Sequence, residues 1–136
     1  MPTPATDYFR YFAGGPELRR WGLGLTAAGV TAVPAGAPYP PKPHPTDHHF
    51  GWERGRVLEA LQIVAISRGR GVFECRPTGR RPIGPGMALV IVPKVWHRYR
   101  PDPDTGWVES WIEVQGPVVE NLLRAEVFSA ADAVRT

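Results

Sequence analysis

Two residues that could carry out proton chemistry or bind a polar ligand lie close together within residues 84–100. A Gly-Pro-Gly turn and a short apolar strand come first, and Pro93 ends that strand because proline has no N–H to donate to a sheet. A second strand is predicted over Val95–Tyr99. Because side chains alternate between the faces of a strand, His97 and Tyr99 share one face. That face offers an imidazole and a phenol side by side.

A second group of suitable residues follows in the predicted strand 107–114. Alternation places Trp107, Glu109 and Trp111 on one face and mostly aliphatic residues on the other, and hydrophobicity alone leaves open which face points inward. Tryptophan rings suit the apolar faces of a sugar, and charged side chains bind its hydroxyl groups. Either Arg54 or Arg56 could supply the guanidinium of such a pocket. The expected ligand is a small polar molecule, with Tyr99 and His97 as further contacts.

A metal site is suggested by His44, His48 and His49, which cluster with Asp47. Adjacent residues of an extended chain point in opposite directions, so His48 and His49 cannot both bind one ion without a bend. We therefore expect solvated loop histidines and no bound metal.

The elements that must position these residues are mainly strands. Residues 34–45 are rich in proline and are expected to form an extended connection outside the sheets. Short β-prone runs separated by turn residues predict an antiparallel barrel or jelly roll, and Gly116-Pro117 predicts a helix over residues 117–128 with one apolar face. Strands 61–67 and 72–75 are expected to pair as a hairpin across the turn at 68–71. The predicted strands cover residues 20–26, 29–33, 61–67, 72–75, 87–92, 95–99 and 107–114.

Composition limits the possible classes of protein. The 136 residues fit one domain, divided here into an N-terminal arm (1–16), a barrel (17–116) and a C-terminal helical part (117–136). The lone Cys75 cannot form an internal disulfide, and no stretch has the apolar length of a membrane span or a signal peptide, so we expect a cytoplasmic protein. The net charge is +3, but the arginines are spread along the sequence, which does not by itself indicate a nucleic-acid face.

Several segments together resemble the N-terminal sensor domains of AraC-type bacterial transcription regulators, and the 84–100 segment resembles the second motif of the cupin barrel. The resemblance implies a cupin-like β-barrel that binds a small effector, often a sugar, and forms a homodimer. It also implies an N-terminal arm that can close over the ligand; the aromatic residues 8–12 could do this or could only seal the core. The segments that carry the resemblance are 7–12, 20–23, 38–41, 55–58, 69–74 and 96–102.

The resemblance also assigns roles to individual residues. Tyr99 matches a ligand-contacting tyrosine, Trp111 a stacking tryptophan, and Arg54 or Arg56 a ligand-contacting arginine. Glu109 stands where the arabinose-responsive member has a histidine, so the resemblance favours a polar ligand without pointing to arabinose. Of the four metal-ligand positions of metal-dependent cupins, only His97 carries a ligand, because Arg56, Leu58 and Gln62 occupy the others. No cofactor is expected.

The resulting hypothesis is an effector-sensing and dimerisation domain, not an enzyme. In the family a C-terminal pair of helix-turn-helix motifs binds DNA, and this sequence lacks them, so we expect contact with DNA only through a domain outside this chain. The chain would be a sensor fragment or a stand-alone relative. A carbohydrate isomerase or epimerase, with His97 as base and Tyr99 as acid, is the alternative; the two residues would lie about 7 Å apart on one strand. A third possibility is an interaction module without a ligand, if Trp107, Trp111 and Tyr99 fill the interior.

Overall fold

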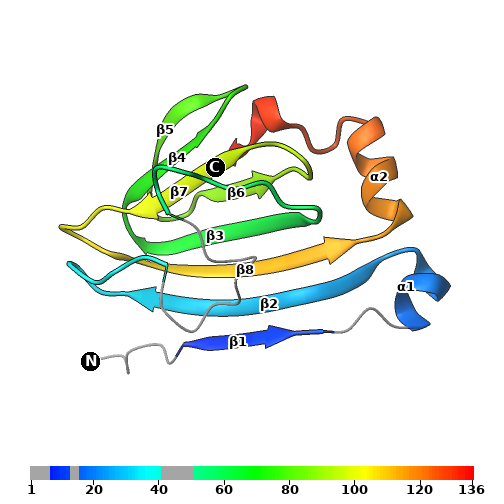
Figure 1. The fold of residues 1–136 in the computed structure, drawn as a ribbon, viewed down its shortest axis with the longest axis horizontal. Coiled ribbons are helices and arrows are strands. Elements are labelled where there is room, and N and C mark those ends of the chain that lie inside the picture. Colours follow the sequence, from blue (N-terminus) through cyan, green and yellow to red (C-terminus); the bar gives the residue numbers. More distant parts are fainter. Residues whose placement is uncertain (1–6, 13–15, 41–50) are drawn as a thin grey trace.

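The computed structural model describes residues 7–12, 16–40 and 51–136. Its elements form two antiparallel sheets (Figure 1). One sheet has six strands in the order β1-β2-β8-β3-β6-β9, and the other has three in the order β5-β4-β7. The elements in chain order are β1 (Tyr8–Tyr11), α1 (Pro16–Trp21), β2 (Gly24–Val33), β3 (Leu61–Gly69), β4 (Gly71–Cys75), β5 (Gly79–Ile83), β6 (Ala88–Ile91), β7 (His97–Pro101), β8 (Trp107–Gln115), α2 (Pro117–Arg124), the 3-10 helix η1 (Ala130–Asp132) and β9 (Val134–Arg135).

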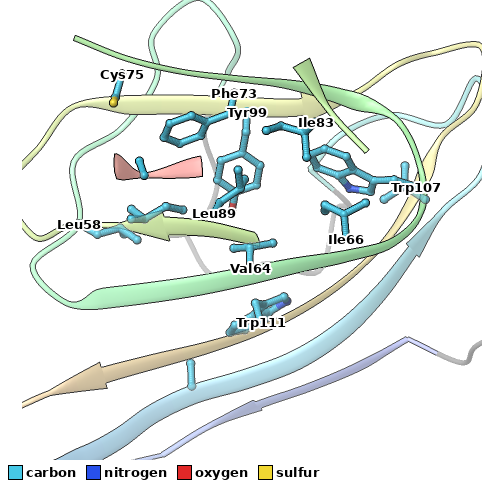
Figure 2. Packing of buried hydrophobic residues seen from close by; sticks show 14 residues of the cluster. Leu58, Val64, Ile66, Phe73, Cys75, Ile83, Leu89, Tyr99, Trp107 and Trp111 are labelled. Atoms are coloured by element: carbon cyan, nitrogen blue, oxygen red, sulfur yellow. The ribbon is translucent and has the colours of Figure 1, made fainter. Parts of the chain in front are cut away.

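A single core joins the two sheets. Figure 2 shows Tyr99 of the smaller sheet lying between Phe73 and Trp107, with Ile66 of the larger sheet below Trp107. Burying a large apolar side chain stabilises the fold by roughly 1.5–3 kcal/mol, so this cluster holds the sheets face to face. The predicted cupin-like jelly roll with a C-terminal helix is therefore confirmed.

The inward faces of β7 and β8 follow the period of two. In β8 the residues Trp107, Glu109, Trp111 and Glu113 are buried, while the intervening residues are exposed or half-buried. Hydrophobicity alone left open which face of this strand points inward, and the structure shows that it is the aromatic and acidic face. In β7 the buried residues are His97, Tyr99 and Pro101.

The predicted hairpin of strands 61–67 and 72–75 is wrong. β3 pairs with β6 and β8 in the larger sheet, whereas β4 pairs with β5 and β7 in the smaller one. The chain crosses between sheets at Gly69, where φ is +79° and an added Cβ would lie 2.0 Å from the Gly106 carbonyl oxygen. A glycine is required there for both reasons. The close approach of Gly106 therefore fixes the conformation of the turn at Gly69.

The predicted strands 20–26 and 29–33 also need correction. Residues 20 and 21 belong to α1, and β2 is one strand of ten residues in place of two short ones. β1 is a strand of the larger sheet, antiparallel to β2, with Phe9 opposite Gly29. The aromatic N-terminal segment thus docks on the domain.

The C-terminal helix begins at Pro117, as the sequence predicts, but it ends at Arg124. Val119 and Leu123 of α2 pack against Leu61 and Val90 on the outer side of the larger sheet. The chain then returns to β6 through η1 and β9. None of the helices in the described ranges is long and apolar enough to cross a membrane.

Candidate functional site

Arg56 is held at the inner wall of the barrel by a backbone bridge to β7. Its N–H donates to the His97 carbonyl oxygen and its own carbonyl oxygen accepts from the His97 N–H, both at 3.0 Å. Because this bridge fixes the backbone of Arg56 beside the start of β7, the guanidinium can reach the inward face of that strand. Arg54, two residues earlier, is exposed.

The Arg56 guanidinium binds three side chains from two strands. Its Nε donates to Nε2 of His97 at 3.1 Å, and its Nη2 donates to Oε1 of Gln62 at 2.9 Å and to Oη of Tyr99 at 2.7 Å. His97, Gln62 and Tyr99 are 1%, 2% and 4% exposed. The result is a buried polar cluster with a fixed positive charge.

The protonation of His97 follows from these contacts. Nε2 accepts from Arg56, so Nδ1 carries the hydrogen and donates it to the Val95 carbonyl oxygen at 3.1 Å. Burial, and next the Arg56 charge, lower the pKa of His97 to about 3. Burial raises the pKa of Tyr99 to about 12. At neutral pH both side chains are uncharged.

The structure brings together three of the four positions that resemble metal-ligand positions, namely Arg56, Gln62 and His97. The Arg56 guanidinium occupies the lone pairs of His97 Nε2 and Gln62 Oε1 that a metal ion would need. The fourth position, Leu58, is buried in the apolar core. The donor set therefore does not fit a cupin metal.

A second polar cluster surrounds Glu109 of β8, which is 3% exposed. The hydroxyl of Tyr39, from the segment after β2, donates to the Glu109 carboxyl, with oxygen distances of 3.0 Å and 3.3 Å. Burial raises the pKa of Glu109 to about 7, against the smaller lowering effects of Tyr39 and Arg56. Burial, followed by the charge of Glu109, raises the pKa of Tyr39 well above its usual value.

Two buried hydrogen-bonding groups beside Glu109 have no hydrogen-bond partner among the described residues. They are the Thr31 hydroxyl, on a residue that is 0% exposed, and the Trp107 indole N–H, on a residue that is 2% exposed. Thr31 lies directly opposite Glu109 in the pairing of β2 with β8. The Trp107 indole N–H is directed at the Glu109 carboxyl and lowers its pKa as a hydrogen-bond donor, although no hydrogen bond of normal geometry joins them. Buried polar groups are normally satisfied by protein, water or a ligand, so these two groups mark a position that a polar molecule could occupy.

Aromatic rings connect the two clusters. Tyr39 lies 6.2 Å from Tyr99 and 5.9 Å from Trp107 between ring centroids, and Tyr99 lies 6.1 Å from Trp107. Tyr39 and Tyr99 also line a cavity of about 190 Å³ between the segment after β2, Trp52 and the turn after β7. Tyr39 therefore contacts both the cavity and the Glu109 carboxyl.

Trp111 lies apart from these clusters, next to the N-terminal strand. Its ring centroid is 6.3 Å from that of Phe9 and 6.2 Å from that of Tyr11. An added Cβ on Gly29 would lie 2.7 Å from the Trp111 ring, so only glycine lets the ring cross β2. The aromatic N-terminal segment thus covers one of the predicted ligand-contacting side chains.

The predicted site residues fall into four places. His97, Tyr99 and Arg56 form one buried cluster, and Glu109 and Trp107 belong to the adjoining one. Trp111 contacts β1, and Arg54 stays at the surface. Sequence reasoning missed Thr31 and Tyr39. The alternation of β2 could have indicated that Thr31 faces inward, but nothing in the proline-rich segment indicates that Tyr39 does.

The predicted loop histidines, His44, His48 and His49, lie outside the described residues. Within the described ranges, no three His, Cys, Asp or Glu side chains lie close enough together to hold a metal ion.

Comparisons with known proteins agree with this architecture. The family described as AraC-like ligand binding domain matches residues 36–132. No curated protein matches the chain significantly. Among solved structures, the protein YhaK from Escherichia coli is similar at 14% identity and a TM-score of 0.56; the match covers 82% of this chain but only 45% of YhaK, and it shows a shared fold alone. The Cnp3 cupin domain of Schizosaccharomyces pombe matches at 15% identity and a TM-score of 0.47, covering 88% of this chain and 71% of that domain.

Proposed function

This chain belongs to the AraC-like ligand-binding domain family, and we propose that it senses a small polar effector, a sugar, inside the barrel. The observation that carries the proposal is the Glu109 cluster, where the Thr31 hydroxyl and the Trp107 indole N–H are buried without a hydrogen bond of normal geometry among the described residues. A sugar hydroxyl could accept from the indole, pair with the Thr31 hydroxyl and donate to the carboxylate. Such a ligand would satisfy all three groups together.

The cavity beside Tyr39 and Tyr99 supports an effector of modest size. Its volume of about 190 Å³ lies below the roughly 300–1,000 Å³ of pockets for drug-sized ligands, which favours a single sugar ring over an oligosaccharide. Tyr39 lines this cavity and donates its hydroxyl to the Glu109 carboxyl. In our proposal an effector hydroxyl replaces that of Tyr39 at Glu109. Because Trp107, Trp111 and Tyr99 pack into one core cluster, an interaction module without a ligand stays the competing hypothesis.

The remaining parts of the proposal are signal transmission and assembly. Trp111 reaches from the inward face of β8 to the rings of β1, so a ligand that moves Trp111 would change the docking of the N-terminal segment. We propose that this change alters the arrangement of a homodimer and thereby controls DNA binding by a separate domain. Hydrogen exchange of residues 8–11 with and without a bound sugar tests this step, and unchanged protection would contradict it.

The enzyme alternative receives less support from the geometry. The His97 and Tyr99 rings are stacked, 6.1 Å apart at an interplanar angle of 11°, and Arg56 binds both. A substrate could not lie between this base and this acid. With a pKa of about 3, His97 would also be a weak base.

A thermal-shift screen tests the proposed function. The purified chain is heated with L-arabinose, D-xylose, D-galactose, D-glucose and the corresponding polyols, since a ligand of the native state raises the melting temperature. We expect at least one sugar to raise it by roughly 5 °C at saturation. Glu109→Gln and Thr31→Val should abolish the shift, while Ser110→Ala, on the outward face of the same strand, should keep it. Equal shifts in all variants, or no shift with any sugar, would contradict the proposal.

A further inference from the structure

Charge is distributed unevenly along the sequence. Residues 60–101 contain eight of the 16 basic residues and one of the 13 acidic residues. This stretch includes all of the three-stranded sheet. The smaller sheet is therefore much more basic than the chain as a whole. The basic residues are Arg68, Arg70, Arg76, Arg80, Arg81, Lys94, Arg98 and Arg100, and the acidic residue is Glu74.

The strand register collects three of these arginines on one surface. Glu74 of β4 lies opposite Arg80 of β5 and Arg98 of β7, and Val72 lies opposite Arg100. Directly paired residues point to the same side of a sheet, and the alternate residues, such as Phe73, fill the core. Arg80, Arg98 and Arg100 thus share the outer side. Sequence spacing alone does not predict this grouping, because the three residues lie on two separate strands.

Trp52 holds these arginines in place. The guanidinium carbons of Arg98, Arg100 and Arg80 lie 4.2, 4.0 and 5.5 Å from the centroid of its ring. Arg98 also donates to the Trp52 carbonyl oxygen at 3.1 Å. Stacking uses the flat face of a guanidinium and leaves the N–H groups at its edge able to donate. We call Trp52, Arg80, Arg98 and Arg100 the arginine face.

Glu74 balances only part of this charge. It accepts from Arg98 Nε at 2.7 Å and lies 3.6 Å from Arg80 Nη2. Arg80 has 59% of its side chain exposed, and Arg100 is also exposed. The arginine face therefore keeps a net positive charge and donors directed at solvent.

We propose that the arginine face binds the phosphate backbone of double-stranded DNA without reading its sequence. Guanidinium groups fit phosphate oxygens with two parallel hydrogen bonds, and contacts to several phosphates release counterions. A single strand, which binds by stacking its bases on aromatic rings, fits less well because arginines already cover Trp52. An acidic peptide would have to become ordered on the surface, whereas a duplex already presents regularly spaced charges. Trp52 and Arg100 also border the cavity beside Tyr39 and Tyr99, but the contact with DNA uses the outer side of the smaller sheet and goes beyond the proposed function.

Fluorescence anisotropy with a labelled 20-base-pair duplex tests the proposal on the whole chain. Phosphate contacts from the two exposed arginines, Arg80 and Arg100, predict that affinity falls about 12-fold between 50 and 200 mM salt, equally for two unrelated duplex sequences. The double variant Arg80→Gln/Arg100→Gln should bind at least about 5-fold more weakly and lose most of the salt dependence. The control Arg20→Gln/Arg124→Gln, which removes the same charge from α1 and α2, should change affinity less than about 2-fold.

A second readout leaves the three arginines of the arginine face unchanged. In a ¹H–¹⁵N spectrum, the Trp52 indole resonance, assigned with Trp52→Phe, should move on addition of the duplex, while that of the exposed Trp21 stays. Absence of binding at 50 mM salt, equal weakening in both double variants, or an unchanged Trp52 signal would overturn the proposal. Equally tight binding of a poly-glutamate peptide would also overturn it, by indicating an acidic protein surface as the partner.

Discussion

At the residue scale, the centre of the polar interior is a half-buried arginine that binds buried, neutral side chains. Arg56 donates to His97, Gln62 and Tyr99, and its charge also acts on Glu109. A buried charge is tolerated only when hydrogen bonds replace the lost water, so these partners and Arg56 depend on one another. The arginine thus supplies the positive charge of this cluster.

Replacing Arg56 should be far more costly than replacing Arg54. Arg56→Met removes the hydrogen bonds to the buried His97, Gln62 and Tyr99 and should lower the free energy of unfolding by about 3 kcal/mol, measured by urea denaturation. It should also raise the pKa of His97, because the Arg56 charge helps to lower it. Arg54→Met is the control, since Arg54 is exposed and the hydrogen bond from Trp96 goes to its backbone carbonyl. Similar losses in both variants would refute this account of the cluster.

Glu109 should make the protein less stable as pH rises through a defined window. Its pKa is about 7 in the folded state and lies near the ordinary glutamate value of 4.5 in the unfolded chain. Between these values the unfolded chain loses its proton first, so fewer protons are bound in the unfolded state and stability falls with pH. Relative to Glu109→Gln, the wild type should lose up to roughly 3 kcal/mol between pH 4.5 and 7.

Urea denaturation of both proteins at pH 4, 5.5, 7 and 8 measures this difference. Comparing the two removes the opposite effect of His97, whose lowered pKa makes stability fall as pH drops from about 6.5 to about 3. A difference that does not change with pH would show that Glu109 titrates normally in the fold.

Some of these side chains could be predicted from sequence and others could not. Period two correctly paired His97 with Tyr99 and Trp107 with Glu109, because the alternation of a strand is local. It could not choose between Arg54 and Arg56, which are two residues apart and have the same parity; the backbone bridge to His97 decides in favour of Arg56. Tyr39 escaped prediction because its position depends on tertiary contacts with Tyr99, Trp107 and Glu109.

At the element scale, β8 organises the larger sheet. It pairs with β2 on one side and β3 on the other, and it carries Trp107, Glu109 and Trp111 inward. Its first residue follows Gly106, where an added Cβ would lie 2.0 Å from the Val33 carbonyl oxygen. The close packing of Gly106 and Gly69 therefore sets the position of the inward residues of β8 relative to β2 and β3.

Glycine replacements at two turns should separate close packing from backbone conformation. Gly69 and Gly79 have φ values of +79° and +67°, but an added Cβ at Gly69 would meet the backbone of Gly106 and Trp107, whereas at Gly79 it would meet nothing within 4 Å. Gly79→Ala should cost about 1 kcal/mol, the ordinary price of a left-handed conformation. Gly69→Ala should cost more than about 3 kcal/mol. Melting temperatures of the two variants measure this, and equal decreases would mean that Gly106 can move away.

The close contact between Gly69 and Gly106 explains why the strands were predictable from the sequence and their pairing was not. Turn composition at residues 68–71 correctly indicated a reversal of the chain between β3 and β4. A hairpin and a crossing between sheets can use the same turn residues, and the difference lies in Gly106 and Trp107, more than thirty residues away. Local propensity contains no information about such a contact.

At the scale of the whole molecule, β7 separates the buried polar cluster from the arginine face. Its inward residues, His97 and Tyr99, belong to the buried cluster, and its outward residues, Arg98 and Arg100, belong to the arginine face. The overall fold was predictable because alternating strands and turn residues run through most of the chain. The arginine face was not, because it forms only when β5 and β7 flank β4 (Figure 1).

The most direct test of the effector site is a ¹H–¹⁵N titration of the chain with the sugar that gives the largest thermal shift. The indole N–H of Trp107 is buried beside the Glu109 carboxyl without a hydrogen bond of normal geometry among the described residues, so a ligand at Glu109 should accept its hydrogen and move its resonance downfield in proportion to saturation. The indole of Trp21, which is 68% exposed, should stay unchanged. A sugar that saturates the protein while leaving the Trp107 resonance in place would contradict a binding site at Glu109.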